Sequence, residues 1–317
     1  LWVVLFFGFC MGDIGYGLLL LAASVALMTK ASLRSIGVLG MILSFATLIS
    51  GLLTNSFFGA NLFVRDGDGL INLPHDPAVF AAYTVQGKTT FPAMTLSLLV
   101  GCAQIFVAFV VQSVNETIVL GWRYAIKALS MLMLSAAAFV LAAHVDFMHL
   151  GFNAKFIIGP LKVGEWLTAI PKVLAQAGLV VGGILFFFFS APERKFWLRP
   201  LGGLWDFYGF STGLMGDFLS YIRLFALALA GGLLGNAFNQ IAFMFLPKTS
   251  TGHDFATPWV AVSIVILIVG HTLNFGLGAL GAFVHPLRLT FVEFYKNINF
   301  RGSGRGYRPF GRASSVT

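Results

Sequence analysis

Two arginines stand in long apolar stretches and are the residues best placed to do chemistry in this chain. Arg223 is the single charge in SYIRLFALALAGGLLG, and Arg288 follows Pro286 by two residues in GAFVHPLRLTFVEF. Because arginine keeps its charge, placing it in a membrane helix costs at least about 2.5 kcal/mol on insertion scales. Each arginine therefore predicts a carboxylate partner, either within this chain or on another subunit.

The chain itself offers few partners. Four carboxylates are candidates: Asp13, Asp206, Asp217 and Glu293. Asp217 and Glu293 are the two that could approach an arginine, so an internal ion pair is one structural interpretation. Snorkelling of Arg223 to an interface is another. The functional interpretation is that the carboxylate arrives from a partner subunit.

Polar and small residues near the arginines are candidates for lining an ion path. Six residues of the last apolar segment share an arc of roughly 100° on a helical wheel: His271, Asn274, Gly278, Gly281, His285 and Arg288. Each histidine alone is more typical of a hydrogen-bonded helix residue than of a proton relay. Asn236, Asn239 and Gln240 either solvate an access channel or bond to neighbouring helices. Asp217 and Glu293 complete the set of candidate channel-lining residues.

The elements that position these residues are predicted to be membrane helices. Of the 317 residues, 58% are hydrophobic and 10% are charged, against roughly 25% charged in soluble domains. Apolar runs longer than about 20 residues indicate an all-α polytopic membrane protein. Eight helices are expected, the first incomplete, at residues 1–11, 14–29, 34–54, 91–115, 123–145, 172–191, 213–246 and 259–295. The motif GDIGYG separates the first two, although one long broken helix is an alternative.

The last two predicted helices are too long for an upright crossing. At 1.5 Å per residue, about 34 residues span roughly 50 Å, whereas the hydrocarbon core is about 30 Å thick. Strong tilt would absorb this excess. Residues 199–212 mix aromatics with glycine and suit an interfacial segment. In the long loop 55–90, RDGDG lacks the downstream Glu of a calcium loop and predicts a turn, so we expect no metal and no cofactor.

Basic residues predict how the chain is oriented. With loop 30–34 in the cytoplasm, twelve lysines and arginines lie inside and six outside, which follows the positive-inside rule. Residues 1–298 then form a transmembrane helical domain, and 299–317 form a flexible basic cytoplasmic tail. The abrupt start LWVVLFFG indicates the membrane part of a longer polypeptide whose N-terminal cytoplasmic domain is missing.

Three motifs carry a resemblance to a known family. GDIGYG, SYIRLFALALA and GHTLNFGLGALGAFVHPLRLTFVEFYKN, followed by GYRPF, resemble the C-terminal membrane half of the large stator subunit of V-type and V/A-type rotary ATPases. This subunit is called a in eukaryotes and I in prokaryotes. The resemblance covers nearly the whole chain, and the order and spacing of the two arginine motifs are highly specific.

The resemblance implies a mechanism and a set of partners. Arg223 and Arg288 occupy the positions of the two family arginines that face a rotating ring of small proteolipid subunits, each with a membrane carboxylate. Two half-channels would carry ions to and from that ring. Further expected partners are the peripheral stalk, the other ATPase subunits and the lipid bilayer, and none is a nucleic acid. ATP hydrolysis would occur on other subunits, since no G-x-x-x-x-G-K-[ST] loop is present.

The chain also departs from the family pattern. Many relatives carry Glu ten residues before the second arginine, where this chain has Gly278, and eukaryotic relatives often carry His where it has Gly231. His271 and Asn274 are closer to the prokaryotic branch, so the expected location is a prokaryotic plasma membrane. Proton and sodium both remain possible as the transported ion.

Two rival functions make different predictions. A secondary transporter using both arginines to bind an anionic substrate predicts repeated halves with broken helices at matching positions, and no convincing repeat is visible. A structural membrane anchor for a soluble partner explains the abrupt start but leaves two buried arginines unexplained.

Overall fold

The computed structural model describes residues 1–61, 63–64, 71–72, 83–85, 88–90, 92–119, 121–145, 169–189, 199–246, 248–249, 252–253 and 258–300. The expected all-α class is confirmed in this part of the chain, where all eight expected helices occur. They are α1 (Trp2–Met11), α2 (Ile14–Met28), α3 (Arg34–Thr54), α4 (Pro92–Val119), α5 (Trp122–Val145), α7 (Lys172–Phe189), α8 (Arg199–Met244) and α9 (Trp259–Arg288). A π-helical segment (Leu289–Phe294) and the short α10 (Tyr295–Asn297) continue α9.

Short strand pairs occupy connections between the helices. Each sheet that is described has two strands: β1 (Ser56–Phe57) with β2 (Ala60–Asn61), β3 (Phe63–Val64) with β4 (Ile71–Asn72), β5 (Tyr83–Val85) with β6 (Lys88–Thr90), and β7 (Lys248–Thr249) with β8 (Gly252–His253). The β1–β2 hairpin matters for function because its turn reaches α8. The other pairs lie away from the two arginines along the chain.

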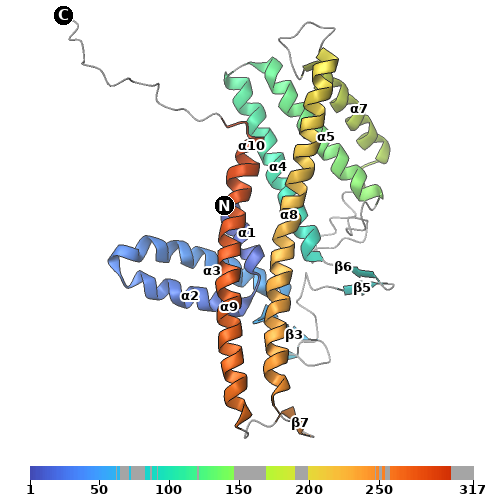
Figure 1. Cartoon of the computed structure of the whole chain (residues 1–317). Coiled ribbons are helices and arrows are strands. Elements are labelled where there is room, and N and C mark those ends of the chain that lie inside the picture. The colour runs from blue at the N-terminus through green and yellow to red at the C-terminus, as the bar shows by residue number, and fades with distance from the viewer. Residues whose placement is uncertain are drawn as a thin grey trace, which may run out of the picture.

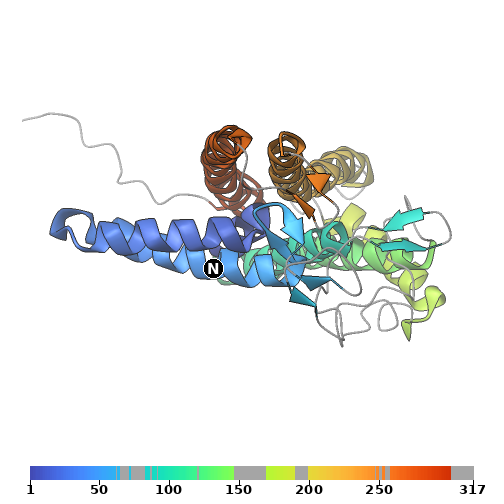
Figure 2. The ribbon, with the colours of Figure 1, turned by 90° about the horizontal axis from the view of Figure 1, so that it is seen from below.

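Helices α8 and α9 form a layer of their own. They run side by side in Figure 1, and Figure 2 shows them together on one side of the remaining helices. The inner face of this layer lies on α1, α4 and α7. The opposite face carries exposed apolar side chains such as Leu219, Leu233, Leu277 and Leu280. Within the described structure, this outer face is therefore open to lipid or to another subunit.

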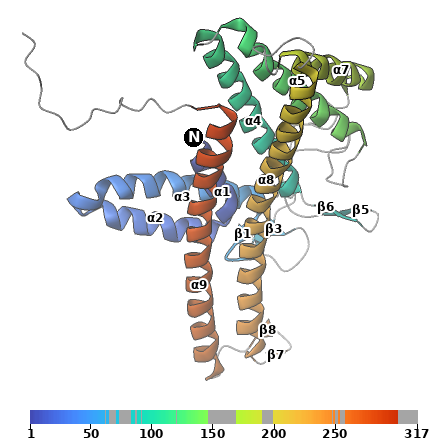
Figure 3. The ribbon, with the colours of Figure 1, turned by 45° about the horizontal axis from the view of Figure 1, so that its top comes forward.

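The α2–α3 hairpin crosses the α8–α9 layer at a steep angle (Figure 3). Two sets of helices that cross in this way cannot both stand upright in one bilayer. With 46 residues, α8 is roughly 70 Å long at 1.5 Å per residue, more than twice the thickness of a hydrocarbon core. The length of α8 therefore supports its expected strong tilt, and the crossing means that at least one of the two sets of helices lies far from upright.

The start of α8 corrects one expectation. Residues 199–212 continue into α8 as one helix that begins at Arg199, fourteen residues before the expected start at 213. Gly203 of this stretch serves helix packing, because a Cβ there would lie 2.9 Å from Cα of Phe187 on α7. Phe207 also packs edge-on against Phe186 of that helix. Contact with α7 therefore favours helix here over a separate interfacial segment.

The expected break after the first helix is confirmed. Gly12 ends α1 in the left-handed region at φ 33°, a conformation that glycine adopts at little cost. Asp13 then caps α2, because its Oδ1 accepts the backbone N–H of Tyr16 at 3.1 Å. Cys10 and Cys102 are both free and buried. The break leaves the Asp13 carboxylate in the protein interior, facing α8 and α9.

Candidate functional site

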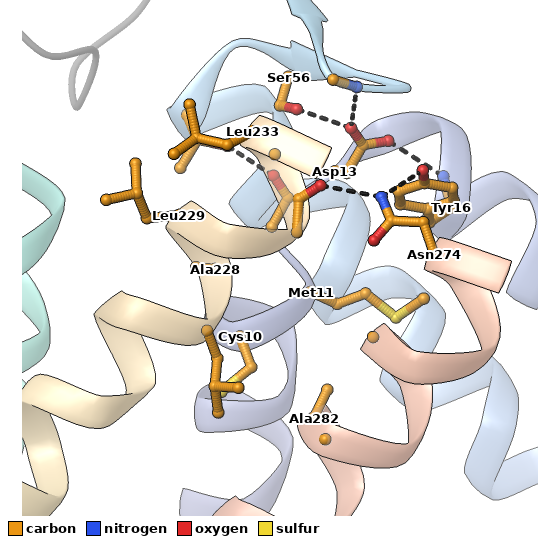
Figure 4. Close-up of a pocket in the computed structure, with 18 of the residues that line it drawn as sticks. Cys10, Met11, Asp13, Tyr16, Ser56, Ala228, Leu229, Leu233, Asn274 and Ala282 are labelled. Carbon is orange, nitrogen blue, oxygen red and sulfur yellow. Dashed lines mark hydrogen bonds between the residues drawn. The ribbon is translucent and has the colours of Figure 1, made fainter. Parts of the chain in front are cut away.

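A cavity of about 380 Å³ lies between the α1–α2 break, α8 and α9 (Figure 4), and we call it the central cavity. Its wall comes from α8 between Phe225 and Asn236 and from α9 between Asn274 and Ala282. Asp13 is its one charged lining residue among the described side chains. The cavity reaches the outer face of the α8–α9 layer, because Leu233 and Leu277 in its lining are 60% and 65% exposed.

The carboxylate of Asp13 is surrounded by donors from this chain. In addition to Tyr16, its oxygens accept the backbone N–H groups of Phe58 and Gly59, each at 3.0 Å, and the hydroxyl of Ser56 at 2.6 Å. Asp13 is 3% exposed, so these four bonds replace the water that a buried carboxylate loses. They join the α1–α2 break to the β1–β2 turn and fix one wall of the cavity.

The Tyr16 hydroxyl connects this wall to α8 and α9. It lies 2.8 Å from Nδ1 of His271 and accepts a hydrogen bond from Nδ2 of Asn274 at 2.8 Å. His271 Nε2 lies 2.9 Å from Oδ1 of Asn239, and Asn274 also donates to the Gly231 carbonyl. His271, Asn274 and Asn239 are thus brought together as hydrogen-bonded helix residues. This is the ordinary interpretation of a histidine in an apolar helix, and the network reaches the cavity through Tyr16 and Asn274, which line it.

Asn236 and Gln240, the other two polar α8 residues that were candidates for an access channel, lie apart from this network. Asn236 is exposed and lines the central cavity, and it accepts a hydrogen bond from Gln240 at 3.3 Å. At the turn beside them, Gly59 adopts a φ of +75°, and a Cβ there would lie 2.4 Å from the Asn236 backbone nitrogen. Backbone therefore meets backbone where the β1–β2 turn touches α8.

A second polar cavity of about 280 Å³ lies at the other end of the two helices, and we call it the terminal cavity. It touches α8 between Gly209 and Asp217 and the end of the α9 continuation between Lys296 and Asn299, with α4 and α5 completing its wall. Its lining contains four charged residues: Glu116, Lys127, Asp217 and Lys296. The terminal cavity is therefore rich in both signs of charge.

Asp217, a candidate partner for an arginine, pairs with a lysine instead. Its Oδ1 accepts from Nζ of Lys296 at 2.9 Å, and its Oδ2 accepts from the Asn297 amide at 2.8 Å. Glu116 accepts from Gln112 at 2.8 Å and from Asn299 at 3.2 Å. Asp217 is thus removed as an arginine partner in this structure and becomes part of the terminal cavity.

Arg223 and Arg288 lie between the two cavities. Within the described residues, no carboxylate lies within ion-pair distance of Arg223, which is partly buried. Nε of Arg288 lies 3.8 Å from Oε1 of the buried Glu293, while the Arg288 side chain is 52% exposed. His285 of α9 lies within electrostatic range of both arginines.

Sequence reasoning missed part of the site. Tyr16, Ser56 and Glu116 were not expected to contribute, and Asp13 was considered only as an arginine partner. Two signals could have indicated them. The GDIGYG motif contains a tyrosine three residues after a helix-capping aspartate, and Glu116 is an isolated acid in the apolar run of α4.

Comparison with known proteins gives relatives over nearly the whole chain, although no family model matches. The chain is 27% identical to the A-type ATP synthase subunit I of Methanocaldococcus jannaschii, over 97% of this chain and 43% of that protein. It is 27% identical to the V-type ATP synthase subunit I of Chlamydia muridarum, over 98% and 51%. It is 28% identical to the A-type ATP synthase subunit I of Pyrococcus abyssi, over 98% and 42%.

These relatives confirm the resemblance that the motifs predicted, namely similarity to proteins named A-type or V-type ATP synthase subunit I. The chain spans about half, or somewhat less, of the length of the curated relatives it matches. Five described helices are also long and apolar enough to cross a membrane. The chain is therefore a membrane-embedded protein.

Proposed function

We propose that this chain is the ion-translocating stator part of a rotary V/A-type ATPase or ATP synthase. Its relatives carry the name of the ATP synthase subunit I, and their similarity extends through both arginine motifs. In this proposal the outer face of α8 and α9 meets a rotating ring of small proteolipid subunits. Arg223 and Arg288 pair in turn with the carboxylate of each passing ring subunit.

The observation that carries the proposal is the position of the arginines relative to the two cavities. Along α8 the order is terminal cavity (209–217), Arg223 and central cavity (225–236). Along α9 and its continuation the order is central cavity (274–282), Arg288 and terminal cavity (296–299). Two separate cavities, a largely apolar one that contains Asp13 and Asn236 and one rich in charge, with fixed cations between them, suit two half-channels that load and unload a ring without joining into a leak.

The outer face supports the proposed ring contact. Arg288 is half exposed there, and the central cavity reaches this face beside Leu233 and Leu277. A carboxylate that arrives on a partner helix can therefore approach both the cavity and the arginine. Gly278 has open space where a Cβ would lie, so the helix surface next to the cavity leaves room for close approach of another helix.

The arginines would drive ion release by electrostatics. A ring carboxylate that faces lipid must carry its ion and be neutral, because a charge in hydrocarbon is costly. Near an arginine the ionised form is favoured. At about 4 Å and an effective dielectric constant of 20 the attraction is about 4 kcal/mol, which offsets the desolvation of both groups. The bound ion, a proton or sodium, then leaves through the adjacent half-channel.

Lining roles follow from the geometry. On the central side we assign Asn236, Asn274 and the Tyr16–His271–Asn239 chain to the wall of one half-channel. On the terminal side we assign Asp217 and Glu116. His285 lies between them, near both arginines. The same proposal places ATP hydrolysis on other subunits and includes the peripheral stalk among the partners. It places the complex in a prokaryotic plasma membrane.

ATP-driven ion pumping tests the proposal. Sealed vesicles that hold the intact complex are prepared with the wild type and with Arg223→Ala, and proton and sodium movement are followed alongside ATP hydrolysis. We expect an assembled complex that no longer pumps, because the ring carboxylate loses its partner at the interface. Arg34→Ala provides a matched control, since Arg34 is exposed at the start of α3 and should leave pumping unchanged.

Normal coupled pumping by Arg223→Ala would refute the stator mechanism. Loss of pumping in both Arg223→Ala and Arg34→Ala would also count against it, because the effect would then come from losing any arginine rather than from the site between the cavities.

A further inference from the structure

The contact between Arg288 and Glu293 depends on an unusual piece of helix. The two residues are five apart, so in a regular α-helix their side chains would point about 140° away from each other. Arg288 directly precedes the π-helical segment Leu289–Phe294, and Glu293 lies within it. Hydrogen bonds in a π-helix run from i to i+5, which stacks residues five apart. The wide turn therefore brings an exposed arginine and a buried glutamate to the same side.

The contact is close but loose. Nε of Arg288 and Oε1 of Glu293 are 3.8 Å apart, beyond hydrogen-bond distance. Asp217 provides a comparison on the same layer, because its two oxygens are held at 2.9 and 2.8 Å. Arg288 is thus paired electrostatically without being locked in place.

Glu293 has little else to hold it. It is buried, and its Oε2 has no hydrogen-bond partner within the described part of the chain. The neighbouring Tyr221 lies within electrostatic reach, but its hydroxyl donates to Gln104 at 2.9 Å. A buried carboxylate oxygen without a donor is costly. Since Glu293 bears this cost next to Arg288, its negative charge is best explained by an interaction with that arginine.

We infer that Glu293 is the resting counter-ion of Arg288 and exchanges places with the ring carboxylate. This inference rests on the proposed function. In the interval after one ring carboxylate leaves and before the next arrives, Glu293 pairs with Arg288. As a ring carboxylate arrives on the exposed side, Arg288 turns to it, and Glu293 draws Arg288 back as the ring advances. Glu293 acts through Arg288 and is a positioning residue.

The exchange predicts a specific kinetic defect. In Glu293→Gln the returning attraction is lost, so Arg288 holds each ring carboxylate longer. We expect the maximal rate of ATP-driven pumping per assembled complex to fall about tenfold, equivalent to about 1.4 kcal/mol in the limiting barrier. The number of ions moved per ATP should stay unchanged. Glu293→Asp keeps the charge but places it farther from Arg288, because the side chain is one methylene shorter, and should give an intermediate rate.

Assembled complex is quantified in the same vesicles, together with Arg288→Ala. A purely structural role for Glu293 would lower the amount of complex and leave its rate per complex at the wild-type level, which would overturn the inference. If Glu293→Gln does not assemble, the Glu293→Asp complex decides, and a wild-type rate there would equally overturn it. Normal pumping by Arg288→Ala would instead refute the proposed function itself, so the two failures are distinguishable.

Discussion

The central cavity contains one described carboxylate, Asp13, and four donors of the same chain occupy its oxygens. The terminal cavity contains two acids and two lysines, and the Lys296 side chain that binds Asp217 is half exposed. A saturated carboxylate has no capacity left for a passing ion, whereas a long, solvated lysine can release its partner. Asp13 and Asp217 are equally buried, each 3% exposed, so the comparison teaches that the donors decide: backbone and hydroxyl donors fix structure on one side of the arginines, and a half-exposed lysine leaves exchangeable charge on the other.

The largest expected effect is on the central side, from Asp13→Ala. One buried and two partly buried backbone N–H groups would lose their acceptor, so we expect the free energy of unfolding to fall by about 3 kcal/mol. The thermal unfolding midpoint of the purified complex measures this. Asp206→Asn is the matched control. Its pair with Lys127 is about one-third exposed on both sides, and such pairs contribute at most about 1 kcal/mol. Equal midpoints for the two variants would contradict the comparison.

A second substitution tests whether backbone contact also fixes the central wall. Gly59→Ala would force a side chain into the left-handed region and against the α8 backbone. We expect a loss of about 2 kcal/mol of unfolding free energy. Gly278→Ala is the matched control, because nothing lies within 4 Å of the added Cβ. A thermal midpoint for Gly59→Ala as high as that for Gly278→Ala would show that the contact between the β1–β2 turn and α8 can adjust to a side chain, against this prediction.

The smallest effect on stability is expected on the terminal side. Asp217→Asn keeps the shape and an acceptor for Asn297 but removes the charge that Lys296 meets. Because Lys296 is half exposed, we expect the free energy of unfolding to fall by about 1 kcal/mol or less. Pumping per assembled complex should nevertheless fall severalfold, since the charge belongs to the proposed half-channel. The comparison fails if stability falls as much as in Asp13→Ala while pumping per complex is unchanged.

The sequence was sufficient for features that depend on local chemistry. Apolar runs predicted all eight helices, and Gly12 with Asp13 predicted the break between α1 and α2, because a left-handed glycine and a capping aspartate act within a few residues. The two arginines stood out because a permanent charge in an apolar run needs an explanation wherever the helix lies.

Contacts between distant residues could not be predicted in the same way. Tyr16 meets His271 across 255 positions, and Asp217 meets Lys296 across 79. Such pairs depend on how helices cross, which the sequence pattern of a single helix does not encode. The prediction that this helix starts at residue 213 was wrong for a related reason, since α8 begins at Arg199. Residues 199–212 were expected to form an interfacial segment, but the missing side chain of Gly203 makes room for α7 and the stretch joins α8.

The seating of the β1–β2 turn on α8 has a mechanical consequence. Asn239 of α8 donates to the Phe58 carbonyl at 2.8 Å, and Gly59 abuts the backbone at Asn236. A ring that turns against the outer face, as proposed, pushes α8 sideways with every step. In that case the turn, which contacts α8, α2 and α3, would pass this force to the α2–α3 hairpin, which projects sideways from α9 (Figure 1). The α2–α3 hairpin would then help to resist the sideways force on α8 and limit its bending.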